Sequence, residues 1–346
     1  MKLKKIILYI SLAVLAVVAY FGFKVYQIIF TPNTQFSEEK VAVYIPTDAT
    51  FEEVQTILSP YIKDMGTFVS LAERRSYSNN IKAGKFEITQ GMNNNKIITA
   101  LRLNLPVKVT FNNQERLEDF AGRLGSQLEL DSLEVLNLFK DPAFLKENGF
   151  TEETVFTLFL PNTYEFYWNT STEKLRNQFT KEYYRFWHEE RKAKAERQGL
   201  TPIEVSILAS IVQKETAKVS ERPRVAQVYL NRLKKGMLLQ ADPTVIYAYK
   251  KETNDFTQVI KRVVNKHLIT DSPYNTYKYG GLPPGPIFMP DVNAVEAVLN
   301  PEQHDFLYFC ASVTNFGYHE FATTLEQHNV NARKYIAWLT NQTAPQ

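Results

Sequence analysis

The sequence is poor in the residues that form disulfides and hold metals. Its 346 residues include a single cysteine, Cys310, and five histidines. One cysteine excludes an intramolecular disulfide, and the histidines lack the HExxH or similar spacing of metal ligands. We therefore predict no metal site and no cofactor. The apolar run around Cys310 favours a buried position in a strand.

An excess of charge of one sign is also missing. The 40 lysines and arginines nearly balance the 37 acids, giving a net charge of +3, and the basic residues form no stripe. A nucleic-acid partner is therefore not expected. The 44% hydrophobic content is typical of a folded protein with one or two cores. The 19 tyrosines and 23 phenylalanines suit either a core or a groove that stacks on sugars.

An uncharged apolar run at residues 6–23 follows Lys2, Lys4 and Lys5. As a helix it would span about 27 Å, enough for the hydrocarbon core of a bilayer. The basic start predicts that the N-terminus is cytoplasmic and that the rest of the chain lies outside. A cleaved signal peptide is the alternative. The length of the run and the lack of an A-x-A site favour an uncleaved single-pass anchor in the cytoplasmic (inner) membrane.

The remainder of the chain predicts an α+β protein with two folded parts. Residues 1–30 contain the N-terminus and the anchor, and residues 31–40 are a polar juxtamembrane linker. Residues 41–105 form a small α+β module with two short strands and three helices. Residues 106–340 form a larger α+β domain, in which a charged, solvated helix is expected over residues 175–198.

The most informative stretch begins at Thr201. Thr201 and Glu204 form a capping box, and Pro202 suits the first helical position. The following residues are apolar on most of the helix circumference, which predicts a helix inside a domain.

Glu215 lies three, four and seven residues after Val212, Ile211 and Leu208, and so continues the apolar stripe of this helix. Loss of solvation there would raise the pKa of its carboxyl group. An acid that stays protonated near neutrality can donate a proton to a leaving oxygen and take it back. Alternatively, Glu215 only marks where the helix reaches water, and this stretch alone leaves both interpretations open.

The next segment predicts two further helices. Ser220 is expected to cap the first of these, and Gly236 to end it. Asp242 and Pro243 are typical of the N-cap and first turn of the second. Gln240 and Asp242 lie on the connection, where polar residues suit the lining of a cleft. Spacing alone favours the simple capping role for Asp242.

Two other segments allow a structural or a binding interpretation. Residues 271–291 are rich in proline and glycine and predict a fixed loop, whose Tyr274, Asn275 and Tyr277 suit a rigid binding wall. Alternatively, the prolines and glycines only shape the loop, and its polar residues are exposed without binding a ligand. The aromatic segment at residues 156–168 suits sugar stacking, but such clusters more often belong to a core.

Several long motifs, in one order, resemble the YceG-like family of membrane-anchored endolytic murein transglycosylases. The three most specific are SIVQKETAKVSERPRVAQVYLNRLKKGMLLQADPTVIYA, SPYNTYKYGGLPPGPI and HEFATTLEQHN. The blocks KAGKFEITQGMNNNKIITAL and FLPNTYEF resemble more N-terminal parts of the family. The resemblance thus covers most of the chain outside the anchor.

This resemblance implies a lytic enzyme that cleaves the bond between N-acetylmuramic acid and N-acetylglucosamine inside nascent peptidoglycan. It uses no water, leaves 1,6-anhydro ends, terminates glycan elongation and so helps organise the cell wall. The catalytic glutamate of the family falls on Glu215. Gln213 stands where many relatives have a first Glu, and Asn162 where the aromatic block often has Asp. Residues 41–105 resemble a LysM-like module, and residues 106–340 the catalytic domain.

The resemblance also implies partners and a substrate-binding set. The partners are peptidoglycan strands, lipid-linked while nascent, the membrane, and the synthases that make the strands. Lone histidines more often form hydrogen bonds than bind ligands. The implied substrate-binding residues are Gln240, Asp242, Tyr274, Asn275, Tyr277, His319, His328 and Asn329.

Two other functions remain open from the sequence. A muramidase would hydrolyse the same bond and would need a second carboxylate, for which Glu221 and Asp242 are the near candidates in sequence. A non-enzymatic peptidoglycan-binding scaffold of the elongation machinery would tolerate loss of the Glu215 carboxyl group.

Overall fold

A computed structural model describes residues 2–343, which fold as two compact α+β units. Unit 1 comprises Met1–Val109, Gln127–Leu130 and Tyr164–Ser171, and unit 2 comprises Thr110–Ser126, Asp131–Thr163 and Thr172–Gln346. The paired strands β3 (Pro106–Phe111) and β4 (Asn162–Tyr167) carry the chain from one unit to the other.

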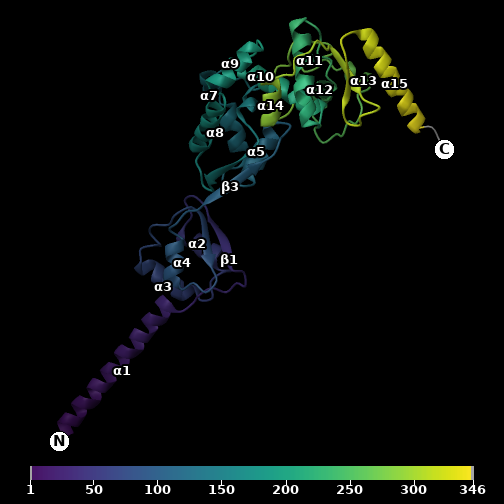
Figure 1. Cartoon of the computed structure of the whole chain (residues 1–346). Helices are drawn as coiled ribbons and strands as arrows, with labels where there is room; N and C mark the ends of the chain where they lie inside the picture. The colour runs from purple at the N-terminus through teal and green to yellow at the C-terminus, as the bar shows by residue number, and fades with distance from the viewer. Residues whose placement is uncertain (1, 344–346) are drawn as a thin grey trace. The chain divides into compact units, whose positions relative to one another are not determined.

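Unit 1 begins with α1 (Lys2–Phe30), an uninterrupted helix (Figure 1). By length and composition, α1 could cross a membrane. Its last turn packs on the rest of unit 1, because Ile28 and Ile29 contact the core and Asn94 Nδ2 donates to the Ile28 carbonyl at 2.9 Å. The end of the apolar helix is therefore part of the folded module.

The rest of unit 1 is a two-stranded antiparallel sheet with three helices. Its strands pair from Lys40 opposite Thr89 to Ile45 opposite Gly84. The core gathers apolar side chains from both strands and from the helices, as the alternation in the sequence predicts. The elements are β1 (Lys40–Ile45), α2 (Phe51–Leu58), α3 (Met65–Arg74), β2 (Gly84–Thr89) and α4 (Asn94–Ala100).

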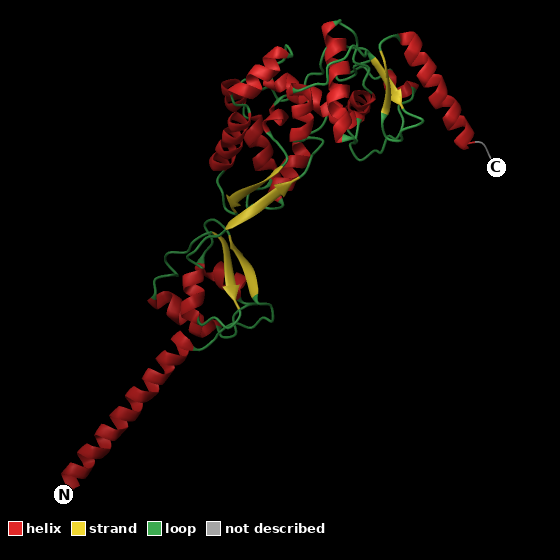
Figure 2. Cartoon of the chain, viewed as in Figure 1, coloured by secondary structure: helices red, strands yellow, loops and turns green. Residues whose placement is uncertain are grey.

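Unit 2 is mostly helical (Figure 2). Its N-terminal half contains α5 (Leu117–Gly125), α6 (Ser132–Lys140), α7 (Pro142–Asn148), η1 (Val155–Leu158), α8 (Thr172–Phe186) and α9 (Glu189–Arg197). Its C-terminal half contains α10 (Pro202–Glu215), η2 (Val219–Glu221), α11 (Arg222–Lys234), α12 (Asp242–Thr253), α13 (Asn265–Leu268), α14 (Val292–Leu299), the hairpin β5 (Tyr308–Ala311) and β6 (His319–Ala322), and α15 (Leu325–Thr343).

Aromatic rings form the core of the first half of unit 2. Phe111, Phe120, Phe139, Phe159 and Phe179 contact one another with ring centroids between 4.1 and 6.0 Å apart. Most of these pairs are edge-to-face, the arrangement that the ring quadrupoles favour. The core interpretation of the aromatic segment is therefore confirmed for Phe156 and Phe159, whereas Tyr167 near its end is exposed.

The predicted charged helix over residues 175–198 is wrong in two respects. It is two helices, α8 and α9, which are separated at Trp187 and His188. It is also not fully solvated, because Leu175, Phe179 and the Trp187 indole are buried. The break has a physical reason, since the buried indole ends α8 and a new helix begins with acids in its first turn, where the helix dipole favours negative charge.

Two predicted caps also differ in the structure. Ser220 lies within η2, and the N-cap of α11 is Glu221, whose side chain makes no capping bond. Asp242 is the first residue of α12, and the cap position belongs to Ala241. In both places a carboxylate bonds to a residue from another segment: Glu221 bonds to His319, and Asp242 bonds to Tyr277. Gly236, in contrast, follows α11 at φ +65°, as predicted.

Cys310 lies in β5, as predicted, but it is only partly buried. The reason is that β5 and β6 form an isolated two-stranded hairpin. Such a small sheet cannot enclose both faces of its strands.

Candidate active site

Helix α10 delivers Glu215 from the interior of unit 2. The predicted capping box is present, with the Thr201 amide donating to Glu204 Oε2 at 2.7 Å and the Glu204 amide donating to Thr201 Oγ1 at 3.2 Å. Every residue from 205 to 212 is buried, because α10 packs against α9, α11, α12 and α14. Glu215 is the last residue of the helix and is half-buried.

The Glu215 carboxyl group accepts one hydrogen bond from the described part of the chain. Tyr229, buried on α11, donates its hydroxyl to Glu215 Oε1 at 2.6 Å. The other oxygen, Oε2, has no hydrogen-bond partner among the residues that the structure describes. One carboxyl oxygen is thus fixed while the other remains available to a ligand.

Burial raises the pKa of the Glu215 carboxyl group to about 7, from an ordinary value of 4.5. This value already includes the Tyr229 hydrogen bond and the positive charge of Arg232, which lower the pKa, and the negative charge of Asp242, which raises it. Desolvation outweighs the opposing effects. A sizeable fraction of Glu215 is therefore protonated at neutral pH, as a general acid requires.

Arg232 lies one turn after Tyr229 on α11 and is buried. Its guanidinium group donates to the backbone carbonyls of Leu307 at 2.6 Å and Leu239 at 2.7 Å. Because these bonds hold the charge in place, Arg232 acts on Glu215 only through its field, with no direct hydrogen bond between them. The sequence alone assigned no role to Tyr229, although its three-residue spacing to Arg232 puts both on one side of α11.

Asp242 joins this cluster from α12, and Tyr277 joins it from the proline-rich loop at residues 271–291. The Tyr277 hydroxyl donates to Asp242 Oδ1 at 2.7 Å. Burial, together with this bond, raises the pKa of the Tyr277 hydroxyl, so it stays protonated. Asp242 is exposed at the helix start, and its charge influences the pKa of Glu215. The structure thus brings together three of the residues predicted for the site.

Glu221, which is buried, and His319, which is half-buried, form a separate pair. Glu221 accepts from the His319 amide at 2.7 Å and lies 2.8 Å from His319 Nδ1. The His319 ring packs edge-on against Phe309, which packs edge-on against Tyr229. Both oxygens of Glu221 are therefore occupied, and the pair supports the wall behind Tyr229.

Gln213, two residues before Glu215, also has a defined role. Its Nε2 donates to Asp291 Oδ2 at 3.0 Å, and its Oε1 accepts from the Asp291 amide at 2.6 Å. These two bonds fasten the residue before α14 to the last turn of α10.

The other predicted residues lie in varied places. Asn275 is fully buried, donates to the carbonyls of Leu268 and Thr270, and accepts from the Tyr277 amide, so it fixes the loop and presents no group to a ligand. Its predicted role in substrate binding is therefore not carried further. Gln240 is exposed, with a left-handed backbone at φ +49°.

His328 and Asn329 lie in the first turns of α15. The His328 ring stacks on Tyr308 with centroids 5.4 Å apart, and burial lowers its pKa. Asn329 is exposed. The structure gives neither residue a bond to the Glu215 cluster.

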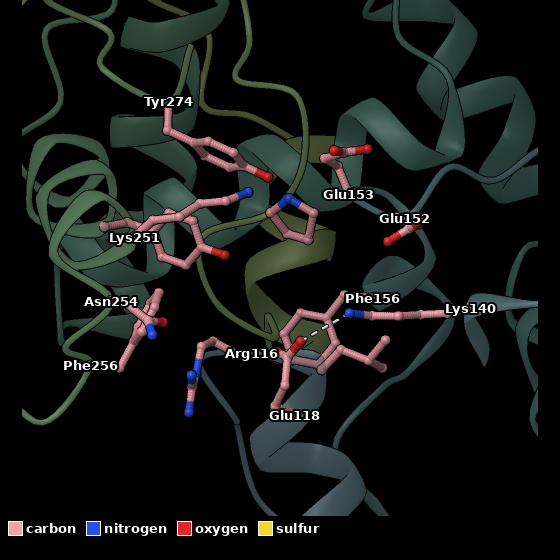
Figure 3. Close-up of a pocket in the computed structure, with 13 residues that line it drawn as sticks. Arg116, Glu118, Lys140, Glu152, Glu153, Phe156, Lys251, Asn254, Phe256 and Tyr274 are labelled. Atoms are coloured by element: carbon pink, nitrogen blue, oxygen red, sulfur yellow. Dashed lines mark hydrogen bonds and ion pairs between the residues drawn. The ribbon is translucent and has the colours of Figure 1, made fainter. Parts of the chain in front are cut away.

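Tyr274 lines a different cavity of unit 2, which encloses about 260 Å³ (Figure 3). Glu215 is not among the residues that line it. Within residues 2–343, no three His, Cys, Asp or Glu side chains gather as a metal site would need.

Comparison with known proteins identifies the family. Residues 43–334 match the YceG-like family, so the chain belongs to it. An endolytic murein transglycosylase of Bacillus subtilis (strain 168) is 28% identical over 88% of this chain and 88% of its own length. One of Streptococcus pneumoniae serotype 2 is 28% identical over 94% of this chain, which spans 64% of that relative.

A solved structure provides an independent comparison. The crystal structure of a YceG-like protein from Listeria monocytogenes matches 85% of this chain and 99% of its own, with 30% identity and a TM-score of 0.56. The fold and the sequence thus lead to the same family.

The raised pKa predicts a pH-dependent stability difference between the wild type and Glu215→Gln. Between about pH 4.5 and 7 the unfolded Glu215 is ionised while the folded one is still protonated, so the wild type loses stability as the pH rises. Glutamine does not titrate and can still accept from Tyr229. The variant should therefore gain about 2 to 3 kcal/mol relative to the wild type between about pH 4.5 and 8.

Chemical denaturation at both ends of this range would measure the effect. Glu252→Gln, on the exposed face of α12, is the matched control and should show no such change. A difference between wild type and Glu215→Gln that is independent of pH would mean that the carboxyl group is not desolvated.

Proposed function

We propose that this chain is an endolytic murein transglycosylase that cuts peptidoglycan strands internally without water. Its membership of the YceG-like family and the names of its relatives support this activity. The single observation that carries the proposal is the Glu215 carboxyl group, with a pKa of about 7, one fixed oxygen and one available oxygen.

In the first step, Glu215 acts as a general acid. Its proton, on Oε2, passes to the glycosidic oxygen between N-acetylmuramic acid and N-acetylglucosamine, and the bond from that oxygen to the anomeric carbon breaks. Tyr229 keeps Oε1 hydrogen-bonded throughout, so the carboxylate that forms is stabilised and stays oriented.

In the second step, Glu215 acts as a base. The 6-hydroxyl of the muramic acid attacks its own anomeric carbon, and its proton returns to Glu215. A C1–O6 bond replaces the C1–O4 bond, no water is consumed, and the product ends in a 1,6-anhydro ring. Since the sugar supplies the nucleophile, a single acid-base residue suffices.

Asp242 has a supporting role in this scheme. Its negative charge helps to keep Glu215 protonated and would stabilise positive charge that develops at the anomeric carbon. The Tyr277 hydroxyl holds one of its oxygens. Asp242 is also the carboxylate that a hydrolytic muramidase would use as its second group, so this observation keeps hydrolysis as the second candidate.

Mass spectrometry of glycan fragments tests the proposal. We expect the full-length chain in detergent to convert uncrosslinked peptidoglycan strands into internal fragments that end in 1,6-anhydro-muramic acid. Glu215→Gln should lower the rate by at least about a hundredfold, because it removes the acid and the base together. Glu252→Gln should cleave as the wild type does.

Asp242→Asn separates the two candidates. A lytic enzyme should retain partial activity with this variant and still form anhydro ends. Reducing ends in the wild-type products, with complete loss in Asp242→Asn, would establish hydrolysis instead. Strands that stay uncut but bound, for wild type and Glu215→Gln alike, would favour a scaffold.

We propose further that α1 anchors the enzyme in the cytoplasmic membrane, with the rest of unit 1 and all of unit 2 outside. Its length and apolar composition support this, as do the lysines at its start. A tether of this kind raises the local concentration of strands that are still attached to lipid and would direct the enzyme to nascent glycan.

A truncation tests this tether. Removing residues 2–23 leaves Ile28 and Ile29 in place on the core of unit 1, so the module should stay folded. We expect the truncated chain to lose its preference for lipid-linked over free strands of equal length. An unchanged preference, measured by competition in the same vesicles, would exclude the tether as its cause.

Unit 1 is proposed to hold glycan as a LysM-like module. Exposed aromatic side chains support this role: Tyr44 on β1 packs edge-on against Trp168 at 5.2 Å, and Tyr167 beside it is also exposed. Such rings suit the apolar faces of sugars.

Binding to isolated peptidoglycan measures this contribution. Tyr44→Ala should weaken the binding of the Glu215→Gln chain several-fold, because one stacking ring is lost. Tyr184→Ala, which removes an exposed tyrosine of unit 2, is the control and should not. Equal binding by the two variants would mean that unit 1 does not contribute to glycan binding.

A further inference from the structure

The cavity of unit 2 shown in Figure 3 is distinct from the Glu215 cluster and has its own chemistry. Side chains from α5, α6, α12, the segment before η1 and the proline-rich loop line it. Its walls carry lysine, arginine and glutamate together with aromatic rings. Which of these charges are already paired decides what the cavity can bind.

Some of the charges are committed to partners within the protein. Arg116 donates to both carboxylate oxygens of Asp119, at 3.1 and 2.6 Å, and stacks on Phe256. Lys140 pairs with Glu118 at 3.1 Å. These groups shape the cavity but offer little charge to a ligand.

Other charges around the cavity lack an ionic partner among residues 2–343. Lys251 Nζ lies 4.7 Å from the centre of the Tyr274 ring and forms no ion pair. Glu152 and Glu153 also make no side-chain hydrogen bond or ion pair. Figure 3 shows Lys251 and Asn254 on one side of the cavity and the two glutamates on the other. The free cation and the free anions thus face a shared space.

Two tyrosines complete the lining. The rings of Tyr247 and Tyr274 lie 4.9 Å apart, and neither hydroxyl has a hydrogen-bond partner in the described part of the chain. Burial raises the pKa of both hydroxyls, so they remain neutral donors. The Tyr274 hydroxyl is turned toward the cavity (Figure 3).

The wall is built by close packing of the backbone. A Cβ atom on Gly285 would lie 2.2 Å from the Glu153 carbonyl oxygen and 3.0 Å from the Tyr274 hydroxyl. Only glycine therefore allows the loop to approach the segment that carries the glutamates. The unpaired groups are held on fixed elements, which lowers the entropy that a ligand must lose on binding.

The cavity shares two elements with the Glu215 cluster. Asp242 begins α12, and Lys251 lies nine residues later, about 13 Å along the helix. Tyr274 and Tyr277 belong to the same loop. A polymer that is held at Glu215 could therefore place a substituent of the same strand at the cavity.

We propose that this cavity binds the peptide stem of the peptidoglycan strand, with a carboxylate of the peptide at Lys251 and an amine at Glu152 and Glu153. A neutral sugar would leave these charges unpaired, whereas a short peptide carries both signs. The proposal rests on the proposed function, because it names the part of the same substrate that a second site reads.

Cleavage of two matched substrates tests the proposal. Strands that carry peptides and strands stripped of them by an amidase are supplied to the full-length chain. We expect wild type to show a higher kcat/KM on peptide-bearing strands, and Lys251→Met to reduce the ratio of the two values about tenfold, the worth of one charge-assisted bond. Lys266→Met, which removes a lysine over Tyr249 outside the cavity, should leave the ratio unchanged.

The acidic side has its own control. Glu152→Gln combined with Glu153→Gln should also lower the ratio, while Glu252→Gln should not. Equal kcat/KM values of the wild type on the two kinds of strand would overturn the proposal. So would equal losses of kcat/KM on both in Lys251→Met.

Direct binding keeps the two proposals separable. A synthetic pentapeptide with one side-chain amine and free carboxylates is titrated into full-length Glu215→Gln by calorimetry. Binding that Lys251→Met abolishes would support the peptide site even if no strand were cut. The absence of binding, with strands still cleaved to anhydro ends, would sink the peptide site and leave the proposed function intact.

Discussion

The desolvated carboxyl group of Glu215 is the constraint on which unit 2 depends. A carboxyl group at the end of a helix buried over residues 205–212 cannot be fully hydrated, and its charged form is therefore disfavoured. Among residues 2–343, the Tyr229 hydroxyl is the one group that bonds to it. Neighbouring residues hold Tyr229 in place. The ring of Phe309 in β5 packs against Tyr229, and Arg232 fixes α11 to Leu307, the residue before β5.

A second set of bonds holds the proline-rich loop next to the cluster. Thr276 Oγ1 accepts from the Ala241 amide at 3.0 Å and lies 2.8 Å from Thr244 Oγ1, and the Gln240 amide donates to the Thr276 carbonyl. Asn275 fastens the other side of the loop to Leu268, the last residue of α13, and to Thr270. These buried bonds set the spacing between Asp242 and Tyr277 without any help from a ligand.

Local patterns in the sequence predicted the helices and strands well, because capping boxes and apolar periodicity are written into short segments. The capping box at Thr201 and the stripe that leads to Glu215 are examples. The roles of residues whose partners lie far away in the sequence were harder to predict. Asp242 and Ser220 have the sequence context of caps, yet the geometry of α12 and η2 gives them other positions. Asn275 looks like a binding residue until its three internal hydrogen bonds are seen.

The position of Glu215 at the C-terminal end of α10 has an electrostatic consequence. The aligned peptide dipoles of a helix place about half a negative charge at this end, which opposes a second negative charge there. The resting side chain therefore tends to be neutral, and an anionic polymer that approaches this helix end meets less repulsion than an ordinary glutamate would create. When the proton leaves, the helix dipole and the apolar surroundings both disfavour the carboxylate that remains. Because its charged form is disfavoured, the carboxylate takes up a proton readily within the same turnover.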